Sequence, residues 1–270
     1  MTLSVLMPIY IKENPVYLHE SLHSLFKQTL PFDELVLIED GPITSALQDV
    51  LSYWEKKLPL RRIALPQNQG LGLALNAGVL ACRNEWIARM DADDLAHPER
   101  FAKQVHYLKN HPEIAVVGSW IREFSESPEQ TLGVRKLPTK PEKIRKFAKK
   151  RSPLNHMTVV FRRSAVLSSG NYQSFLGFED YALWVRMLLA GFQFANLPEC
   201  LVDARAGESL ITRRGGLFYA QREFLFQRDL WQKGFISFPL FCQNILLRVL
   251  VRFLPKALLS RTYRSFLRSS

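Results

Sequence analysis

The stretch Arg89-Met-Asp-Ala-Asp-Asp-Leu95 decides how this sequence is expected to fold. The partly apolar residues 86–90 predict a strand that enters a buried sheet. Pro98 comes soon afterwards and suits the first position of a helix. The stretch is therefore predicted to form a tight turn at the carboxyl end of a strand, which is the edge where open α/β sheets bind their ligands.

Three carboxylates lie on this turn, those of Asp91, Asp93 and Asp94. Carboxylates this close together repel one another unless a cation or hydrogen-bond donors compensate them, and their hard oxygen atoms suit Mg²⁺ or Mn²⁺. Such an ion can bridge to a diphosphate and stabilise it as a leaving group. For an isolated Asp-x-Asp pattern, a solvated turn with helix-capping aspartates is the commoner interpretation, so the surrounding sequence has to decide.

The composition is that of a globular protein large enough for one α/β domain and an appendage. The 270 residues are 47% hydrophobic and 23% charged. The three cysteines show no Cys-x-x-Cys spacing, which argues against a disulfide framework and a zinc site and favours a reducing compartment. A strand pattern begins at the first residues, without the basic and apolar regions of a signal peptide, so a cytoplasmic location is expected.

Strands and helices alternate along the first part of the chain. The predicted strands are 3–7, 34–39 and 61–65, and the predicted helices between them are 16–29 and 45–57. This rhythm predicts right-handed crossovers and a parallel sheet of nucleotide-binding architecture, although a fold does not by itself fix a function.

Two further features are expected at the same edge of the sheet. Asp40 closes the second strand, where it could accept hydrogen bonds from a base or a ribose, or simply form a turn before Gly41. Asn68-Gln-Gly70-Leu-Gly72 opens a helix, where glycines allow close backbone approach and a helix start favours anions. Packing of the helix on the sheet is the alternative explanation for these glycines, because a glycine pattern alone is a weak signal.

The motifs taken together resemble those of family 2 glycosyltransferases. They occur in the order and near the spacings of that family: Pro8-x-Tyr10, Glu39-Asp40-Gly41, Asn68-x-Gly70 with Asn76-x-Gly78, and Asp91-x-Asp93-Asp94. The resemblance covers about residues 3–210 and is to bacterial transferases that assemble exopolysaccharide, capsule or lipopolysaccharide, of the amylovoran-synthesis type. It implies the GT-A fold, an α/β architecture in which helices flank a Rossmann-like nucleotide-binding mixed sheet, followed here by a basic helical C-terminal extension.

The same resemblance assigns the donor side. It implies a nucleoside site formed by Pro8, Tyr10, Asp40, Asn68 and Gly70. Asp91 would lie near the ribose and the metal, and Asp93 would be the main ligand of a Mn²⁺ or Mg²⁺ ion at the donor diphosphate. The segment that begins at Arg205 resembles the family's short basic loop that folds over the donor phosphates. The expected donor is a nucleotide-sugar, with a UDP-sugar as the first choice.

A second stretch, Gly177-Phe-Glu179-Asp180-Tyr-Ala-Leu-Trp184, carries the expected base. An inverting transfer needs one base that takes a proton from the acceptor hydroxyl, and the start of a helix keeps a carboxylate ionised for this purpose. Asp180 could also be a helix N-cap, but the resemblance to the family's Glu-Asp motif favours Asp180 as the base. The same motif implies that Glu179 and Trp184 help to hold the acceptor.

The middle of the chain is also expected to handle the acceptor. It contains two predicted strands, 114–118 and 120–124, and a basic run, 140–151, that is either a solvated helix face or a positive rim near a pyrophosphate or an anionic membrane. His156 belongs to a segment that resembles the family's histidine-containing strand beside the active site, which would place it at the acceptor. A core histidine with satisfied hydrogen bonds is an equal alternative for His156.

The end of the chain is strongly basic. Most of the net charge of +11 comes from residues 230–270, which hold seven basic residues and no acidic one. After a predicted helix over 215–232, the apolar run 235–247 is shorter than the ~20 residues that a spanning helix needs. Arginines such as Arg248 and Arg252 then recur at helical spacing, which predicts a helix lying on an anionic membrane surface. A helical hairpin packed on the catalytic domain is the alternative.

These expectations define two domains and one reaction. Residues 1–212 would form the catalytic domain, with a nucleotide-sugar half over 1–112 and an acceptor half over 113–212, and residues 213–270 would form the extension. The chain lacks the Gln-x-x-Arg-Trp signature of polymerising synthases, so we expect transfer of a single sugar, with inversion, to a glycan or lipid-linked glycan at the inner face of the cytoplasmic membrane. The alternatives are a sugar-nucleotide nucleotidyltransferase and an inactive nucleotide-binding relative. A nucleic-acid-binding protein would fit the charge, but no motif for nucleic acid supports it.

Overall fold

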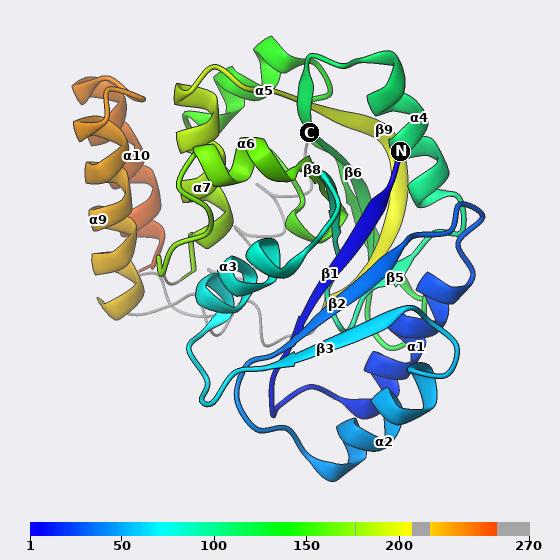
Figure 1. The fold of residues 1–270 in the computed structure, drawn as a ribbon. Coiled ribbons are helices and arrows are strands. Elements are labelled where there is room, and N and C mark those ends of the chain that lie inside the picture. The colour runs from blue at the N-terminus through cyan, green and yellow to red at the C-terminus, as the bar shows by residue number, and fades with distance from the viewer. Residues whose placement is uncertain (176, 207–216, 253–270) are drawn as a thin grey trace.

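A computed structural model describes residues 1–175, 177–206 and 217–252 (Figure 1). One mixed sheet runs through the protein, with helices on both of its faces and a pair of C-terminal helices at one side (Figure 1). This arrangement is the mixed α/β architecture that the sequence predicts.

The strands divide into a parallel half and a mixed half. The parallel half consists of β1 (Leu3–Ile9), β2 (Glu34–Glu39), β3 (Leu60–Ala64) and β4 (Trp86–Arg89). The mixed half consists of β5 (Leu95–Ala96), β6 (Ile114–Phe124), β7 (Thr131–Arg135), β8 (Val160–Arg162) and β9 (Gln193–Arg205). Within the described residues the strand order is β3-β2-β1-β4-β8-β6-β9-β5, with β7 paired to β6. The carboxyl ends of the parallel strands therefore meet along one edge of the sheet.

Helices connect the strands and cover the sheet. Those of the first part of the chain are α1 (Pro15–Phe26), α2 (Ser45–Trp54), α3 (Leu71–Ala81), α4 (Arg100–Asn110), α5 (Pro141–Ala148), α6 (Arg163–Ser168) and α7 (Glu179–Leu189). The C-terminal pair is α9 (Leu217–Gln232) and α10 (Phe238–Arg252). Capping side chains fix where the first helices begin, because Asn14 accepts a hydrogen bond from the Val16 amide at 2.9 Å and Thr44 accepts one from the Leu47 amide at 3.3 Å.

The sheet is buried on both faces because neighbouring residues of a strand point in opposite directions. Val5 and Met7 of β1 belong to a core that includes residues of α1, α2 and α4, whereas Leu6 belongs to a second core that includes residues of α3 and α7. Gly78 lets α3 approach β1 closely, since a Cβ atom at that position would collide with Leu6. With both faces covered, the carboxyl edge of the parallel strands is the natural place for a site.

The mixed half differs from the sequence prediction in two places. The two strands predicted between residues 114 and 124 are one continuous strand, β6, because residues on both sides of Ser119 pair with the same neighbour, β9. The amide of the buried Ser119 donates to Thr158 Oγ1 at 3.0 Å. The predicted histidine-containing strand begins as a 3-10 helix, His156–Thr158, and is extended only from β8 onward. Thr158 Oγ1 also donates to the carbonyl of Asn155 at 2.8 Å, so one side chain closes the 3-10 turn and holds β6.

The helices α9 and α10 form a hairpin that packs against α7 (Figure 1). Phe226 and Phe235 belong to the same hydrophobic core as Phe178 and Tyr181. The rings of Phe178 and Phe226 stack with their centroids 4.6 Å apart. The packed-hairpin alternative is therefore confirmed for residues 217–252. The described residues, 1–175, 177–206 and 217–252, contain no helix with the length and apolar character needed to cross a membrane.

A buried polar network attaches the hairpin to the end of α5. Glu223 is fully buried, and its carboxylate accepts a hydrogen bond from Arg248 Nη1 at 2.7 Å. Arg248 also donates to the carbonyl of Lys150, and Asn244 donates to the carbonyl of Lys149 at 3.0 Å. The predicted membrane-facing position of Arg248 is therefore wrong, because its charge neutralises a buried carboxylate. The later basic side chains of that predicted stripe, like the predicted domain boundary, lie outside what the structure describes.

Candidate active site

The acidic turn, residues 91–94, connects β4 to β5 and is held by neighbouring elements. Ser21 Oγ of α1 donates to the carbonyl of Asp91 at 2.9 Å. The amide of Arg205, at the end of β9, donates to Asp94 Oδ1 at 2.9 Å. The turn is thus positioned by the fold itself, which lowers the cost of orienting a ligand on it.

The three carboxylates of the acidic turn lie close together. One oxygen atom from each of Asp91, Asp93 and Asp94 lies within 4.8 Å of the other two. Burial and the charge of Asp91 raise the pKa of Asp93 to about 6. Burial and the charges of both neighbours raise the pKa of Asp94 well above its usual range. When all three carboxylates are ionised, the cluster therefore carries more negative charge than the surrounding positive groups neutralise.

A hard divalent cation fits this set of donors. Asp94 is 2% exposed, and its Oδ2 is buried without a hydrogen-bond partner among the described residues. A cation would neutralise the repulsion among the carboxylates and engage this oxygen. The sequence predicted Asp91 and Asp93 as ligands and placed Asp94 on the turn without a ligand role. The position of Asp94 next to Asp93 was the sequence signal that could have added Asp94 to the predicted ligands.

Arg89 lies immediately before the acidic turn and is missing from the predicted site residues. Its side chain is 3% exposed. Its Nη1 donates to Asp91 Oδ2 at 2.6 Å, and its Nη2 contacts Asp91 Oδ1. The carbonyl of Arg89 accepts a hydrogen bond from Arg100 Nη2 of α4 at 2.7 Å. A guanidinium that grips both oxygens of a carboxylate forms a strong, oriented pair, so Asp91 already has a cationic partner.

Three of the residues predicted to bind the nucleoside, Asp40, Asn68 and Gly70, lie together at the end of β2. Asp40 accepts hydrogen bonds from the amides of Gln69 at 2.7 Å and Gly70 at 2.9 Å. Asn68 Nδ2 donates to the carbonyl of Asp40 at 3.1 Å. Gly41 has φ +86°, and a Cβ atom there would lie 2.6 Å from the Asn68 nitrogen, so this close approach requires glycine. The carboxylate of Asp40 retains acceptor capacity for a base or a ribose, because two oxygens offer about four sites.

Pro8 and Tyr10 lie beside this loop at the end of β1. Ile9 pairs with Glu39 in the sheet, and the amide of Asp40 donates to the carbonyl of Ile9 at 2.8 Å. Pro8 is buried and Tyr10 is half-buried. The structure thus brings together all the residues predicted for the nucleoside, and their contacts with a nucleotide stay a prediction.

Asp180 lies in the first turn of α7 and is half-exposed. The N-cap position belongs to Phe178, and no side-chain cap is formed there, so the N-cap explanation of Asp180 is wrong. Ser152 Oγ donates to Asp180 Oδ2 at 3.2 Å. The first turn of a helix favours a negative charge, and the carboxylate is accessible, as a base requires.

Glu179 joins the start of α7 to the start of α3. It is 8% exposed, and its Oε2 accepts a hydrogen bond from the amide of Gly177 at 3.0 Å. A Cβ atom at Gly72 of α3 would lie 2.6 Å from the carbonyl oxygen of Gln173 and 2.9 Å from Glu179 Cγ, so glycine permits this contact. Burial raises the pKa of Glu179. Its predicted contact with the acceptor stays a prediction.

His156 and Tyr172 form a hydrogen-bonded pair. His156 Nε2 lies 2.9 Å from the Tyr172 hydroxyl. Burial and the charge of Arg89 hold the pKa of His156 well below its usual range, so the imidazole is neutral. Burial raises the pKa of Tyr172; the charge of Arg89 opposes this effect, and the charges of Asp180 and Asp91 add to it. The negative charges of Asp180 and Asp91 therefore both favour the protonated form of the Tyr172 hydroxyl. Sequence analysis did not identify Tyr172.

The predicted acceptor contact of Trp184 is wrong. Its side chain is fully buried. Its ring centroid lies 6.0 Å from that of His156, 6.5 Å from that of Tyr172 and 5.9 Å from that of Phe194. Trp184 thus supports the histidine–tyrosine pair from inside the core instead of contacting the acceptor.

Arg205 has contacts other than those predicted for it. Its guanidinium stacks on the rings of Tyr17 and Phe124, 3.8 Å and 4.6 Å from their centroids. It donates to the carbonyl of Asp93 at 3.2 Å and to the carboxylate of Glu20 at 2.6 Å. These contacts make Arg205 a support of the acidic turn. The loop predicted to follow it lies outside the described residues, and a contact with donor phosphates stays a prediction.

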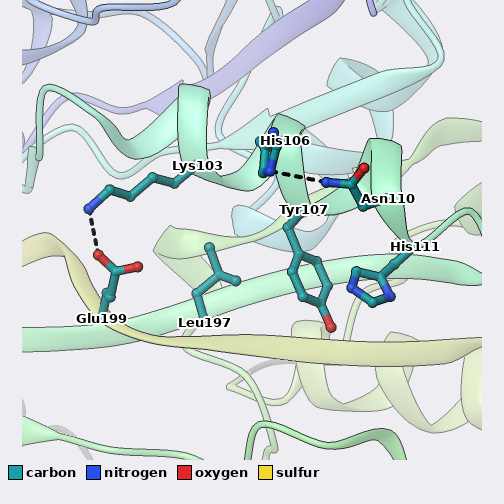
Figure 2. A pocket seen from close by; sticks show the side chains of 7 residues that line it. All are labelled: Lys103, His106, Tyr107, Asn110, His111, Leu197 and Glu199. Atoms are coloured by element: carbon teal, nitrogen blue, oxygen red, sulfur yellow. Dashed lines mark hydrogen bonds and ion pairs between the residues drawn. The ribbon is translucent and has the colours of Figure 1, made fainter.

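A separate cavity of about 320 Å³ lies between α4 and β9 (Figure 2). Lys103 of α4 donates to Glu199 of β9 at 2.5 Å on one side of it, and His106 bonds to Asn110 at 3.0 Å on the other (Figure 2). None of the predicted site residues lines this cavity. We therefore assign the chemistry to the edge of the sheet and not to this cavity.

Comparison with known proteins identifies the family. A family model described as "Glycosyl transferase family 2" matches residues 4–168. The chain belongs to glycosyltransferase family 2. Membership decides between the predicted glycosyltransferase and the nucleotidyltransferase alternative.

Two relatives within family 2 are similar over almost their whole length. The amylovoran biosynthesis glycosyltransferase AmsE of Erwinia amylovora is 41% identical over 263 residues, which is 96% of this chain and 97% of that protein. An Escherichia coli protein named UDP-Gal:alpha-D-GlcNAc-diphosphoundecaprenol beta-1,3-galactosyltransferase is 36% identical over 265 residues, 98% of this chain and 96% of its own. The predicted resemblance to transferases of the amylovoran type is confirmed.

A solved structure shows the same fold. The mannosyltransferase PcManGT of Pyrobaculum calidifontis, in complex with GDP-Man and Mn²⁺, superimposes with a TM-score of 0.66 at 16% sequence identity. The match covers 98% of this chain and 79% of that chain. The GT-A fold predicted for this family 2 member is confirmed.

Proposed function

We propose that this glycosyltransferase moves one sugar, with inversion, from a UDP-sugar to a hydroxyl group of a lipid-linked glycan in bacterial surface polysaccharide synthesis. One observation carries the proposal: one carboxylate oxygen from each of Asp91, Asp93 and Asp94 lies within 4.8 Å of the other two. Such a cluster suits a divalent cation that neutralises a donor diphosphate. The carboxylate of Asp180, in the first turn of α7, would supply the base that a single displacement requires.

On the donor side, the nucleoside would bind between Tyr10 and the loop that Asp40 organises. The donor diphosphate would then lie over the acidic turn. A Mn²⁺ or Mg²⁺ ion held by Asp91, Asp93 and Asp94 would neutralise the diphosphate as it leaves. The Mn²⁺ in the complex of the Pyrobaculum mannosyltransferase supports a divalent cation, and the name of the Escherichia coli relative supports UDP as the carrier.

On the acceptor side, Asp180 would take the proton of the attacking hydroxyl. Ser152 engages Oδ2 of this carboxylate, which fixes the orientation of the group that receives the proton. The acceptor oxygen then bonds to the anomeric carbon while the bond to the diphosphate breaks on the opposite face. The new linkage has the inverted configuration, and one carboxylate is sufficient for this reaction.

A lipid-linked acceptor is supported by the two relatives. One is named for amylovoran biosynthesis, and the other for transfer to a GlcNAc that is carried on diphosphoundecaprenol. Such acceptors lie in the membrane, so a transferase that uses them has to work at its surface. We place this enzyme peripherally on the inner face of the cytoplasmic membrane.

The hairpin supports this location. Its outer surface exposes large apolar side chains, with Phe218 63% exposed, Phe238 54% and Leu247 60%. The ring of Trp231 lies tilted against that of Phe238, with their centroids 5.3 Å apart, and Trp231 is 39% exposed. Tryptophan and phenylalanine at a surface, together with the excess of basic residues over 230–270, are typical of proteins that bind an anionic bilayer.

The donor assignment can be tested by thermal unfolding. We expect UDP with Mn²⁺ to raise the melting temperature by several degrees, because a ligand that binds only the folded state stabilises it. Neither UDP nor Mn²⁺ alone should reproduce this rise. CDP, GDP and dTDP serve as comparisons, and a stronger effect of one of them would reassign the nucleotide. Absence of stabilisation by every nucleotide would overturn the proposed donor site.

The membrane assignment can be tested by sedimentation with vesicles. We expect the full chain to sediment with vesicles that contain anionic phospholipid and to remain in solution with purely zwitterionic ones. The double variant Trp231→Ser/Phe238→Ser should lose most of this binding. Leu80→Ser is a matched control, since Leu80 is 58% exposed on α3 and far along the chain from the hairpin. A wild-type chain that ignores anionic vesicles would rule out this location.

A further inference from the structure

Arg89 is a buried cation whose side chain contacts a carboxylate of the acidic turn. Both terminal nitrogens of its guanidinium contact Asp91, and the side chain is 3% exposed. Its Nε has no hydrogen-bond partner among the described residues. A guanidinium in the interior normally uses all its donors, so this one is only partly satisfied.

The charge of Arg89 reaches the functional groups around it. It opposes the rise in the pKa of Asp93 and of Asp94, lowers the pKa of His156 and opposes the rise in that of Tyr172. The hydrogen bond to Asp91 places the guanidinium against the acidic turn, where its charge acts on these groups.

A cation on the acidic turn and Arg89 compete for the same atoms. Both oxygens of Asp91 contact the guanidinium, so a metal ion that binds Asp91 has to share or displace this contact. A released guanidinium next to the turn would then lack an anionic partner. The donor diphosphate would supply one, because a planar guanidinium binds phosphate oxygens with two parallel hydrogen bonds.

We propose that Arg89 is an exchangeable counter-cation: it holds Asp91 while the turn is free of metal, and it passes to the donor diphosphate when Asp91 takes the ion. In the second state its charge stabilises the leaving group together with the metal. This inference rests on the proposed function, since it concerns the diphosphate of the same donor. It adds a donor-binding role for a residue that precedes the acidic turn.

Two affinities distinguish this role from a purely structural one. They are the affinity for Mn²⁺ without nucleotide, from the electron paramagnetic resonance signal of the free ion, and the affinity for UDP at saturating Mn²⁺. Arg89→Gln removes a positive charge beside the carboxylates, so we expect the affinity for Mn²⁺ to rise at least about tenfold. The affinity for UDP should fall at least about tenfold, because a phosphate contact is lost. A structural role would weaken both.

Two further variants complete the experiment. Arg89→Lys keeps the positive charge but loses the planar guanidinium that can make two parallel hydrogen bonds. The affinity for Mn²⁺ should therefore stay near that of wild type while the affinity for UDP falls. This variant also tests the inference if Arg89→Gln does not fold. Arg61→Gln is the matched control, because Arg61 pairs with Glu34 at 3.2 Å at the start of β2, the opposite edge of the sheet from the turn, and should change neither affinity. Unchanged UDP affinity in Arg89→Gln or Arg89→Lys, or weaker Mn²⁺ binding in Arg89→Gln, overturns the inference. A wild type that binds no nucleotide overturns the proposed function instead.

Discussion

Asp180→Asn is expected to lower the turnover number by about a hundredfold to ten-thousandfold, the usual contribution of a general base. The amide has nearly the shape of the carboxylate but cannot take the proton of the acceptor hydroxyl. Because Asp180 has no role in the proposed donor site, stabilisation of the variant by UDP with Mn²⁺ should match that of wild type. The measurements are steady-state rates with a lipid-linked acceptor and thermal unfolding with the donor nucleotide.

Asp229→Asn provides the matched control for this experiment. Asp229 is a helical carboxylate with one basic partner, Lys233, at 2.6 Å, and it plays no part in the proposed site. Its replacement should leave the turnover number within about twofold of wild type, as surface substitutions usually do. Near-normal turnover in Asp180→Asn, with donor binding intact, would show that another group is the base.

Asp93→Asn is expected to abolish the metal-dependent part of nucleotide binding. At a hundred times its Kd a ligand stabilises the folded state by about 2.7 kcal/mol, and the variant should lose most of that increment for UDP with Mn²⁺. Without metal the variant should be at least as stable as wild type, because it removes one member of a repelling group. Thermal unfolding with and without Mn²⁺ checks both statements.

The same carboxylate predicts how metal binding depends on pH. The pKa of Asp93 is raised to about 6 from an ordinary value of 3.8, so the folded, metal-free protein binds this proton more tightly than the unfolded chain does. Its contribution to stability is therefore present below about pH 4 and is lost as the pH rises through 6. Stabilisation by Mn²⁺ should increase over that interval, because the ion binds the ionised form. A Mn²⁺ effect that is constant from pH 5 to 7 would contradict the assignment of Asp93 as a ligand.

The acidic turn and the parallel half of the sheet could be predicted because local patterns determine them. The alternation of apolar strands with helices predicts β1 to β4, and the three aspartates follow directly on a buried strand. The role of Arg89 was also within reach of a local argument. Residues two apart on an extended chain lie on the same side, so Arg89 and Asp91 are natural partners.

Features that depend on distant contacts could not be predicted in this way. The pairing of Arg248 with Glu223 joins two helices of the hairpin, and neither residue reveals the other by its spacing. A basic residue at helical spacing therefore suggested a membrane surface where the structure has an internal ion pair. The Tyr172–His156 hydrogen bond likewise joins the 3-10 helix His156–Thr158 to a loop residue, and the two segments have no common motif.

The error at Trp184 has a different cause. Its spacing with Tyr181 and Leu188 correctly predicted a helix, but α7 is covered on nearly all sides by the sheet, α6 and the hairpin. An apolar stripe identifies one buried face, and it does not tell whether the rest of the helix is open. Here the exposed part of α7 lies toward its two ends, with Asp180 in the first turn and Leu189, 40% exposed, at the last position.

The attachment of α10 to α5 restricts how enzymes of this kind can diverge. The carbonyls of Lys149 and Lys150 are held by Asn244 and Arg248, and Ser152, a short step further along the same segment, bonds to the expected base. The hairpin, which would meet the lipid, and Asp180, which would accept the proton, are thus mechanically coupled through the backbone of residues 149–152. Exchange of the hairpin between paralogues should therefore alter catalytic efficiency as well as targeting, and adaptation to a new membrane environment would require compensating changes around the acceptor.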